Sequence, residues 1–222
     1  MFPVSDDKPA TRFPIVVIFI AVINAYVFWR EIHLAPDRLE AMIGTFALIP
    51  SRDFAPGLRY MSFFTSMFLH GGLVHLLVNL WSFWIFGDNI EGELGHVRFF
   101  IFYLLSGFGA GLVHVIADPT STVPVVGASG AISGVMGAYM VLFPRAKIRM
   151  FTLLIFYPLF FEIPALVFLA IWLLGQVVSG AAVVGAGSAD SGGIAFMAHV
   201  GGFLSGIVLL PLFRRGRRRR VA

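Results

Sequence analysis

Gly127-Ala128-Ser129-Gly130 begins one long apolar segment, and Ala198-His199-Val200-Gly201-Gly202 lies near the start of another. Apolar segments dominate the whole chain, which has 222 residues, is 58% hydrophobic and has only 13% charged residues. Soluble domains are closer to half apolar and one quarter charged. The composition therefore predicts an integral membrane protein.

The apolar segments predict an all-α fold, a polytopic bundle of six transmembrane helices. An α-helix needs about 20 mostly apolar residues to span a bilayer, and the polar residues of this chain cluster between such runs. We expect residues 13–213 to form the bundle, between a tail at 1–12 and a basic tail at 214–222. The expected spans are residues 13–29, 69–86, 97–116, 127–143, 160–180 and 195–213.

Basic residues predict the orientation of the spans. The tail Arg214-Arg215-Gly216-Arg217-Arg218-Arg219-Arg220 contributes most of the formal net charge of +4 and directly follows a span. Such a tail is expected on the cytoplasmic side, where each residue gains about 1 kcal/mol from anionic lipid headgroups. We expect these lipids, and not nucleic acid, to be its partner. An even number of spans places the N-terminus inside too, with the basic connection 144–149.

The connections between spans carry further predictions. The long connection 30–68 falls outside and is expected to lie partly in the membrane interface. The connection 181–194 is also outside and is rich in Gly, Ala and Ser. Residues 151–161 are expected at the inner interface, with span five starting near Glu162. Residues 87–95, which include Glu91, read as a turn on the inner side.

Three polar residues share one depth in this topology. Spans two, four and six all run from outside to inside, and His75, Ser129 and His199 lie near their outer ends. Small residues recur every four positions on spans four and six, which favours close helix contact in lipid. That contact would bring Ser129 within reach of His199. The small residues are Gly130, Gly134 and Ala138 on span four, and Ala198, Gly202 and Gly206 on span six.

A serine beside a histidine predicts nucleophilic catalysis. Neutral His199 can take the hydroxyl proton of Ser129, whose oxygen then attacks a carbonyl. No carboxylate is placed to orient His199, so we predict a dyad. The alternatives are a serine that caps or packs its helix and a histidine satisfied by a carbonyl group. A histidine inside a span is nevertheless a functional hypothesis by default.

Hydrogen-bond donors for an oxyanion are expected on span two. His75 and Asn79 are four residues apart and share one helix face. The start of span four adds free backbone N–H groups. The alternative for Asn79 is a hydrogen bond to a neighbouring helix. His70 is expected to point elsewhere and to be structural.

With these residues assembled, the chain resembles the rhomboid family of intramembrane serine proteases over nearly all of residues 13–213. Gly127-Ala128-Ser129-Gly130 matches the family's GxSG motif, and His75-Leu76-Leu77-Val78-Asn79 matches its HxxxN motif. Ala198-His199, with Gly202 and Gly206, matches AHxxGxxxG. The three motifs occur in order on spans two, four and six.

The resemblance implies a Ser129 nucleophile and a His199 base. It also implies that His75, Asn79 and the Ser129 backbone N–H bind the oxyanion, and that no metal or cofactor is needed. The connection 181–194 would cap a water-filled cavity, and span five would be a lateral gate for transmembrane protein substrates. We expect a bacterial plasma membrane protein, because the core is compact and no targeting peptide is recognised.

Two departures from the family pattern stand out. Ser133 occupies the position where many members carry an aromatic residue that stacks on the histidine. The family's Trp-Arg pair in the first outer connection is missing, and the chain reads Tyr60-Met61-Ser62-Phe63 there.

The alternative function is a non-catalytic rhomboid-like protein that binds membrane clients, although its usual mark is loss of the serine or histidine. A transporter would show intramembrane charges and a broken-helix repeat. The absence of cysteine excludes a thiolate nucleophile, and no His-Glu-x-x-His metal motif occurs.

Overall fold

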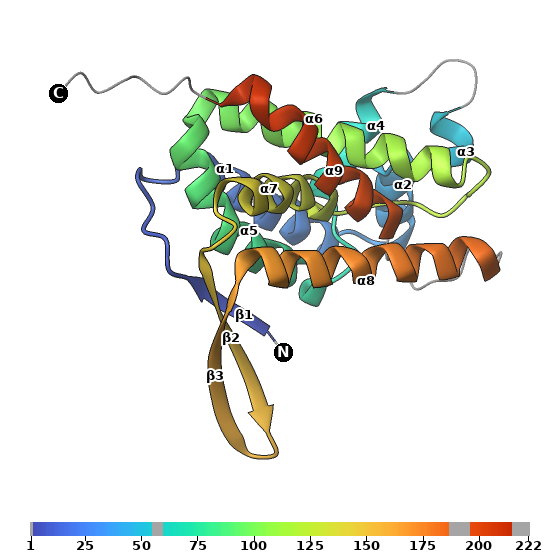
Figure 1. Ribbon diagram of the computed structural model, residues 1–222. Helices are drawn as coiled ribbons and strands as arrows, with labels where there is room; N and C mark the ends of the chain where they lie inside the picture. The colour runs from blue at the N-terminus through green and yellow to red at the C-terminus, as the bar shows by residue number, and fades with distance from the viewer. Residues whose placement is uncertain (1, 55–59, 187–195, 215–222) are drawn as a thin grey trace.

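The computed structural model describes residues 2–54, 60–186 and 196–214. A helix lies in each segment where a span is predicted, and together these helices form one bundle (Figure 1). The helices are α1 (Ile15–Ile32), α5 (Leu73–Leu94), α6 (His96–Ala117), α7 (Ser129–Leu142), α8 (Ala165–Ala186) and α9 (Phe196–Phe213).

The helices differ in how they meet the requirements for crossing a membrane. Four of them, α1, α6, α8 and α9, are long and apolar enough by themselves. Helix α5 meets the requirement jointly with the segment Tyr60–Phe68, from which it is bent by 94°, and α7 is a shorter apolar helix. The protein is thus an all-α polytopic membrane protein with four or five candidate spans by this measure among the described residues, where six are predicted.

Helix α7 lies at the centre of the bundle (Figure 1). Every residue from Gly130 to Tyr139 is buried, because α5, α6, α8 and α9 pack around it. The backbones of α7 and α9 touch: a Cβ atom on Gly202 would overlap the carbonyl oxygen of Gly130, and one on Gly206 would overlap that of Gly134. The predicted contact between two small-residue stripes is confirmed.

The prediction of a turn at residues 87–95 is wrong. Helix α5 continues to Leu94, and the chain reverses only at Gly95, which has φ 80°. Glu91 is fully buried, and its two carboxylate oxygens each accept a hydrogen bond of 2.9 Å from the backbone N–H groups of Val16 and Val17. These are free N–H groups in the first turn of α1, so Glu91 caps a helix that is distant in sequence.

A three-stranded antiparallel sheet, not predicted from the sequence, is added to the bundle. Its order is β1 (Phe2–Asp6), β2 (Lys147–Leu154) and β3 (Tyr157–Pro164), and the β2–β3 hairpin extends away from the helices (Figure 1). The connection 144–149 and the expected interfacial segment 151–161 therefore belong largely to one hairpin. Helix α8 starts at Ala165, five residues after the predicted bound at 160 and three after Glu162.

The N-terminal segment packs against the bundle through this sheet. Strand β1 pairs with β2, and the hydroxyl of Tyr139 in α7 donates a hydrogen bond to Asp6. Burial raises the pKa of Asp6. At the other end of the chain, the basic residues after Arg214 lie outside the described residues.

The connection between α1 and α5 is a folded segment. It contains α2 (Pro36–Phe46), α3 (Pro50–Asp53), α4 (Tyr60–Thr65) and a 3₁₀ turn at Ser66–Phe68. The N–H of Leu48 donates to the carbonyl of Val125 at 3.1 Å, and the N–H of Val125 donates back at 2.8 Å. This pairing ties the connection to the strand-like segment that leads into α7.

The half-buried Arg52 and the buried Asp53 form an ion pair that stabilises the same connection. The Arg52 guanidinium donates to Asp53 at 2.6 Å and to the carbonyl of Ala47 at 2.7 Å, while Asp53 also accepts the N–H of Ile49 at 2.8 Å. Burial by itself raises the pKa of Asp53, but the hydrogen bonds from Arg52 and Ile49 outweigh it and hold that pKa below its usual range. These contacts organise a connection that lacks the Trp-Arg pair.

The first part of the connection predicted at 181–194 belongs to a helix. Helix α8 continues through residue 186, so residues 181–186 are helical. Residues 187–194, which carry the rest of the predicted cap, lie outside the described residues.

Candidate active site

Ser129 is the first residue of α7 and follows a turn that only glycine accommodates easily. Gly127 has φ +119°, a backbone conformation that side-chain-bearing residues rarely adopt. Its N–H donates to the carbonyl of Ser66 at 2.9 Å, which fixes the turn. The turn places the Ser129 side chain at the N-terminal end of α7, where backbone N–H groups have no partner within the helix.

The structure brings Ser129 and His199 together. The Ser129 hydroxyl and the Nε2 atom of His199 are 2.8 Å apart, a hydrogen-bond distance, although the residues are 70 positions apart in the sequence. The approach depends on small residues: a Cβ atom on Gly130 would lie 3.7 Å from the carbonyl oxygen of Ala198 and 2.7 Å from the Cβ of Ala110. The contact between α7 and α9 therefore places the two side chains.

Helix α8 supplies two contacts to His199 that the sequence reasoning missed. The Nδ1 atom of His199 lies 2.7 Å from the amide oxygen of Gln176. The Trp172 ring lies with its centroid 5.8 Å from that of the imidazole, tilted by 36°. Ser133, which replaces the family's aromatic residue, is buried and donates its hydroxyl proton to the carbonyl of Ser129 at 2.7 Å.

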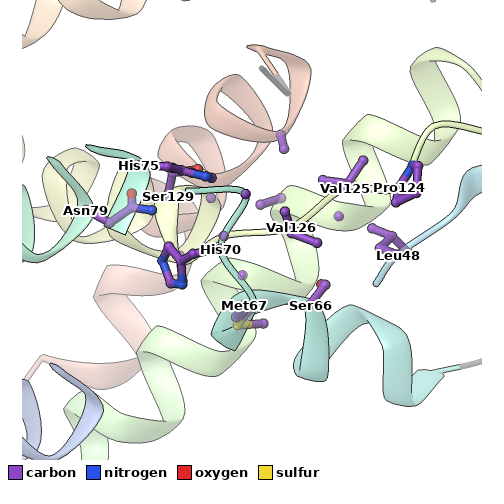
Figure 2. Close-up of a pocket in the computed structure, with 18 of the residues that line it drawn as sticks. Leu48, Ser66, Met67, His70, His75, Asn79, Pro124, Val125, Val126 and Ser129 are labelled. Atoms are coloured by element: carbon purple, nitrogen blue, oxygen red, sulfur yellow. The ribbon is translucent and has the colours of Figure 1, made fainter. Parts of the chain in front are cut away.

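His75 and Asn79 line the same cavity as Ser129 and His199. The cavity has a volume of about 710 Å³, and Figure 2 shows His75, Asn79 and Ser129 grouped at one end of it. A Cβ atom on Gly127 would lie 2.7 Å from His75 Nε2 and 3.5 Å from Asn79 Nδ2, so both side chains lie beside the turn that precedes α7. All four predicted site residues therefore line one cavity.

The amide nitrogen of Asn79 is a buried donor without an acceptor. Asn79 is 4% exposed, and its Nδ2 atom makes no hydrogen bond within the described part of the chain. Leaving a buried donor unsatisfied costs about 1–3 kcal/mol. Because Asn79 lines the cavity, its free N–H groups can donate to an acceptor on a bound ligand.

His70 does not lie where the sequence placed it. It precedes α5, so the helical spacing to His75 does not apply, and the two rings lie 5.3 Å apart between centroids. Its backbone N–H donates to the buried carboxylate of Glu31 at 3.2 Å, and both residues line the cavity. Figure 2 shows His70 beside the group formed by His75, Asn79 and Ser129. Glu31, which the sequence reasoning did not single out, thus fixes the backbone just before α5.

Glu91 does not join this group. Glu91 binds the start of α1, as described above, and His96 Nδ1 lies 2.5 Å from it. Within residues 2–54, 60–186 and 196–214, no group of three or more His, Asp or Glu side chains is arranged to hold a metal ion.

Comparison with known proteins agrees with the resemblance seen in the motifs. The model of the Rhomboid domain family matches residues 58–216, which include all four site residues. Rhomboid protein 1, mitochondrial, from Saccharomyces cerevisiae is 32% identical over 154 residues, covering 67% of this chain and 40% of that protein.

Two bacterial relatives are similar over shorter stretches. The putative rhomboid protease YdcA of Bacillus subtilis is 42% identical over 81 residues, covering 36% of this chain and 40% of the relative. The rhomboid protease GluP of Bacillus subtilis is 30% identical over 123 residues, covering 55% and 23%. This chain therefore spans at most two fifths of the length of these three relatives. The family match extends over more than half of the chain, and the chain belongs to the rhomboid family.

Proposed function

We propose that the protein is an intramembrane serine endopeptidase in which Ser129 and His199 form a catalytic dyad. The observation that carries this proposal is the 2.8 Å contact between the Ser129 hydroxyl and His199 Nε2, made between two helices inside a cavity. The names of the bacterial relatives, a rhomboid protease and a putative one, support the same activity.

The proposed reaction follows from the dyad. The Ser129 hydroxyl donates its proton to His199 Nε2 as its oxygen attacks the carbonyl carbon of a peptide bond. The protonated imidazole then gives this proton to the departing amine, which leaves an ester on Ser129. A water molecule then loses a proton to His199 and attacks the ester, and the imidazolium returns this proton to the Ser129 oxygen as the second product leaves with its new carboxyl group. General-base assistance of this kind contributes roughly 10²–10⁴ in rate.

The oxyanion of each tetrahedral intermediate needs hydrogen-bond donors. We assign this role to the side chains of His75 and Asn79 and to the backbone N–H of Ser129. The buried, unpartnered amide of Asn79 supports the assignment, because the oxyanion would supply the acceptor that it lacks. Donors that are already in place when charge develops lower the barrier most effectively.

The substrates, topology and partners follow the same proposal. We expect transmembrane proteins as substrates, cut within or beside the membrane by a protease domain at residues 13–213. We place both termini in the cytoplasm, with the Arg-rich tail against anionic lipids, and we expect no nucleic acid partner. The cellular membrane is proposed to be a bacterial plasma membrane, although one relative carries a mitochondrial name.

The alternative is a non-catalytic member of the family that binds membrane clients. Labelling with a fluorophosphonate, which reacts with activated serines, separates the two functions. We expect labelling of the wild type and none of Ser129→Ala or His199→Ala. Ser106→Ala, a buried serine of α6 beside Gly134, and His33→Ala, at the end of α1, are matched controls that should label normally. Equal labelling of the wild type and Ser129→Ala would disprove the assigned nucleophile.

A further inference from the structure

Gln176 is a polar side chain in an otherwise apolar helix. Between Ala165 and Gly180, α8 contains only two polar residues, Gln176 and Ser179. The neighbouring side chains Leu174, Val177 and Val178 are exposed and face outward from the bundle. Polar side chains inside spans are costly and tend to face the bundle interior with a specific partner. The partner of Gln176 is His199, at 2.7 Å.

The two ring nitrogens of His199 have different partners. Nδ1 faces the amide oxygen of Gln176 at 2.7 Å, and Nε2 faces the Ser129 hydroxyl at 2.8 Å. An amide oxygen can only accept, so Nδ1 carries the proton in this arrangement. Nε2 of the neutral ring then has its lone pair free to accept the serine proton. The chain of hydrogen bonds runs through α8, α9 and α7.

We propose that Gln176 is the third member of the site, a positioning residue that holds His199 in the Nδ1–H tautomer and directs its Nε2 toward Ser129. The inference rests on the proposed function, in which His199 is the base, and it adds an orienting amide where the sequence offered no carboxylate. In serine proteases with a triad, a buried carboxylate holds the histidine tautomer in this way. Here a neutral amide does so.

The Gln176 amide is neutral, so it does not provide a negative charge to stabilise protonated His199. Among residues 2–54, 60–186 and 196–214, the titratable groups in electrostatic range of His199 are His75 of α5 and His114 of α6. The Ser129 hydroxyl on α7 and the Gln176 amide on α8 face its ring nitrogens. None of these is an anion. A carboxylate in place of the amide would stabilise the imidazolium, so that protonated His199 would persist to higher pH.

Trp172 supports the same placement. It lies four residues before Gln176, on the same face of α8, and its ring contacts both His199 and Phe203 of α9. Helix α8 thus contacts one imidazole nitrogen with Gln176 and the ring itself with Trp172. Trp172 and Gln176 together hold the imidazole, which Ser133 has no aromatic ring to contact.

The first test is ¹⁵N NMR of protein labelled at histidine nitrogens, in lipid, with the His199 signals identified from a His199→Gln sample. We expect the Nδ1–H tautomer in the wild type and in Gln176→Glu, and a mixture of tautomers in Gln176→Leu. Val178→Ala, at an exposed site on the same helix, should match the wild type. An unchanged His199 tautomer in Gln176→Leu overturns the inference, whether or not the protein cleaves anything.

The second test is the pH–rate profile for cleavage of a transmembrane substrate in liposomes. We expect Gln176→Leu to lower kcat about tenfold with little change in KM, as loss of one hydrogen bond of about 1.4 kcal/mol predicts. Gln176→Glu should keep kcat near the wild-type value above neutral pH and move the acid limb to higher pH. If Gln176→Leu does not fold, the Gln176→Glu variant decides: an acid limb of its pH–rate profile at the same pH as in the wild type contradicts the inference. A wild type that cleaves no better than Ser129→Ala disproves the proposed protease instead, and the NMR result still decides the role of Gln176.

Discussion

Gly202 of α9 lies directly against the carbonyl oxygen of Gly130 in α7, so closely that a Cβ atom on Gly202 would overlap this oxygen. The contact lies next to both proposed catalytic residues, because Gly130 follows Ser129 and Gly202 is three positions after His199. Packing of small residues at this point therefore sets the distance between the proposed nucleophile and base.

Substitution of Gly202 by valine should separate α7 from α9. The obstacle is backbone, which cannot rotate away, and overpacking of a close-packed interior costs about 1–3 kcal/mol. We expect a lower thermal unfolding temperature in detergent and loss of fluorophosphonate labelling. Gly44→Ala in α2, where no atom lies within 4 Å of an added Cβ, is the control and should be neutral or slightly stabilising. Normal labelling of Gly202→Val would contradict the packing argument.

Gly127→Ala should impair catalysis without removing any functional side chain. The new methyl group would meet His75 at 2.7 Å, and the backbone at φ +119° is unfavourable for alanine. We expect kcat to fall at least tenfold. A double-mutant cycle with His75→Ala measures the coupling: because the collision vanishes without the ring, the two effects should be less than additive. Simple additivity would show that the ring does not lie against Gly127 during turnover.

Asn79→Ala should slow turnover and leave stability intact. Its Nδ2 donor has no partner in the described structure, so little stabilisation is lost when it is removed. The loss of one oxyanion donor costs roughly 10²–10³ in kcat. Asn24→Ala, at a buried asparagine of α1 that does not line the cavity, is the control for turnover. An Asn79→Ala rate equal to that of the wild type would remove Asn79 from the oxyanion site.

Asp53 should contribute a pH-dependent part of the stability. Hydrogen bonds from Arg52 and Ile49 hold its folded-state pKa below the unfolded value of about 3.9. Its contribution is therefore complete above that value and is lost as the pH falls through the lower folded-state pKa. Asp53→Asn should unfold at a lower temperature than the wild type at pH 7, and the difference should shrink below about pH 4. A difference that stays constant down to pH 2 would contradict this account.

The positions of the helices, and the grouping of His75, Asn79, Ser129 and His199 around one cavity, could be predicted because their signals are local in the sequence. Apolar length fixed the positions of the helices, and four-residue spacing of small residues indicated that α7 and α9 touch. The GxSG and AHxxG patterns then pointed to Ser129 and His199, which lie 2.8 Å apart.

Features that depend on contacts between distant elements could not be predicted. Glu91 looked like part of a turn because its partners, Val16 and Val17, are more than 70 residues away. The β2–β3 hairpin could not be distinguished in the sequence from the apolar segment of α8, because the exposed tip of the hairpin at Ile155 and Phe156 is also apolar. The contacts of Gln176 and Trp172 with His199 could not be predicted, because sequence spacing alone does not indicate which face of α8 packs against His199.

The most direct test of the proposed activity is cleavage of a single-span protein substrate in liposomes that contain the purified protein. The account predicts one defined cut by the wild type and no cut by Ser129→Ala or His199→Ala, with both variants folded as judged by thermal unfolding. Cleavage by folded Ser129→Ala at the wild-type rate would contradict it.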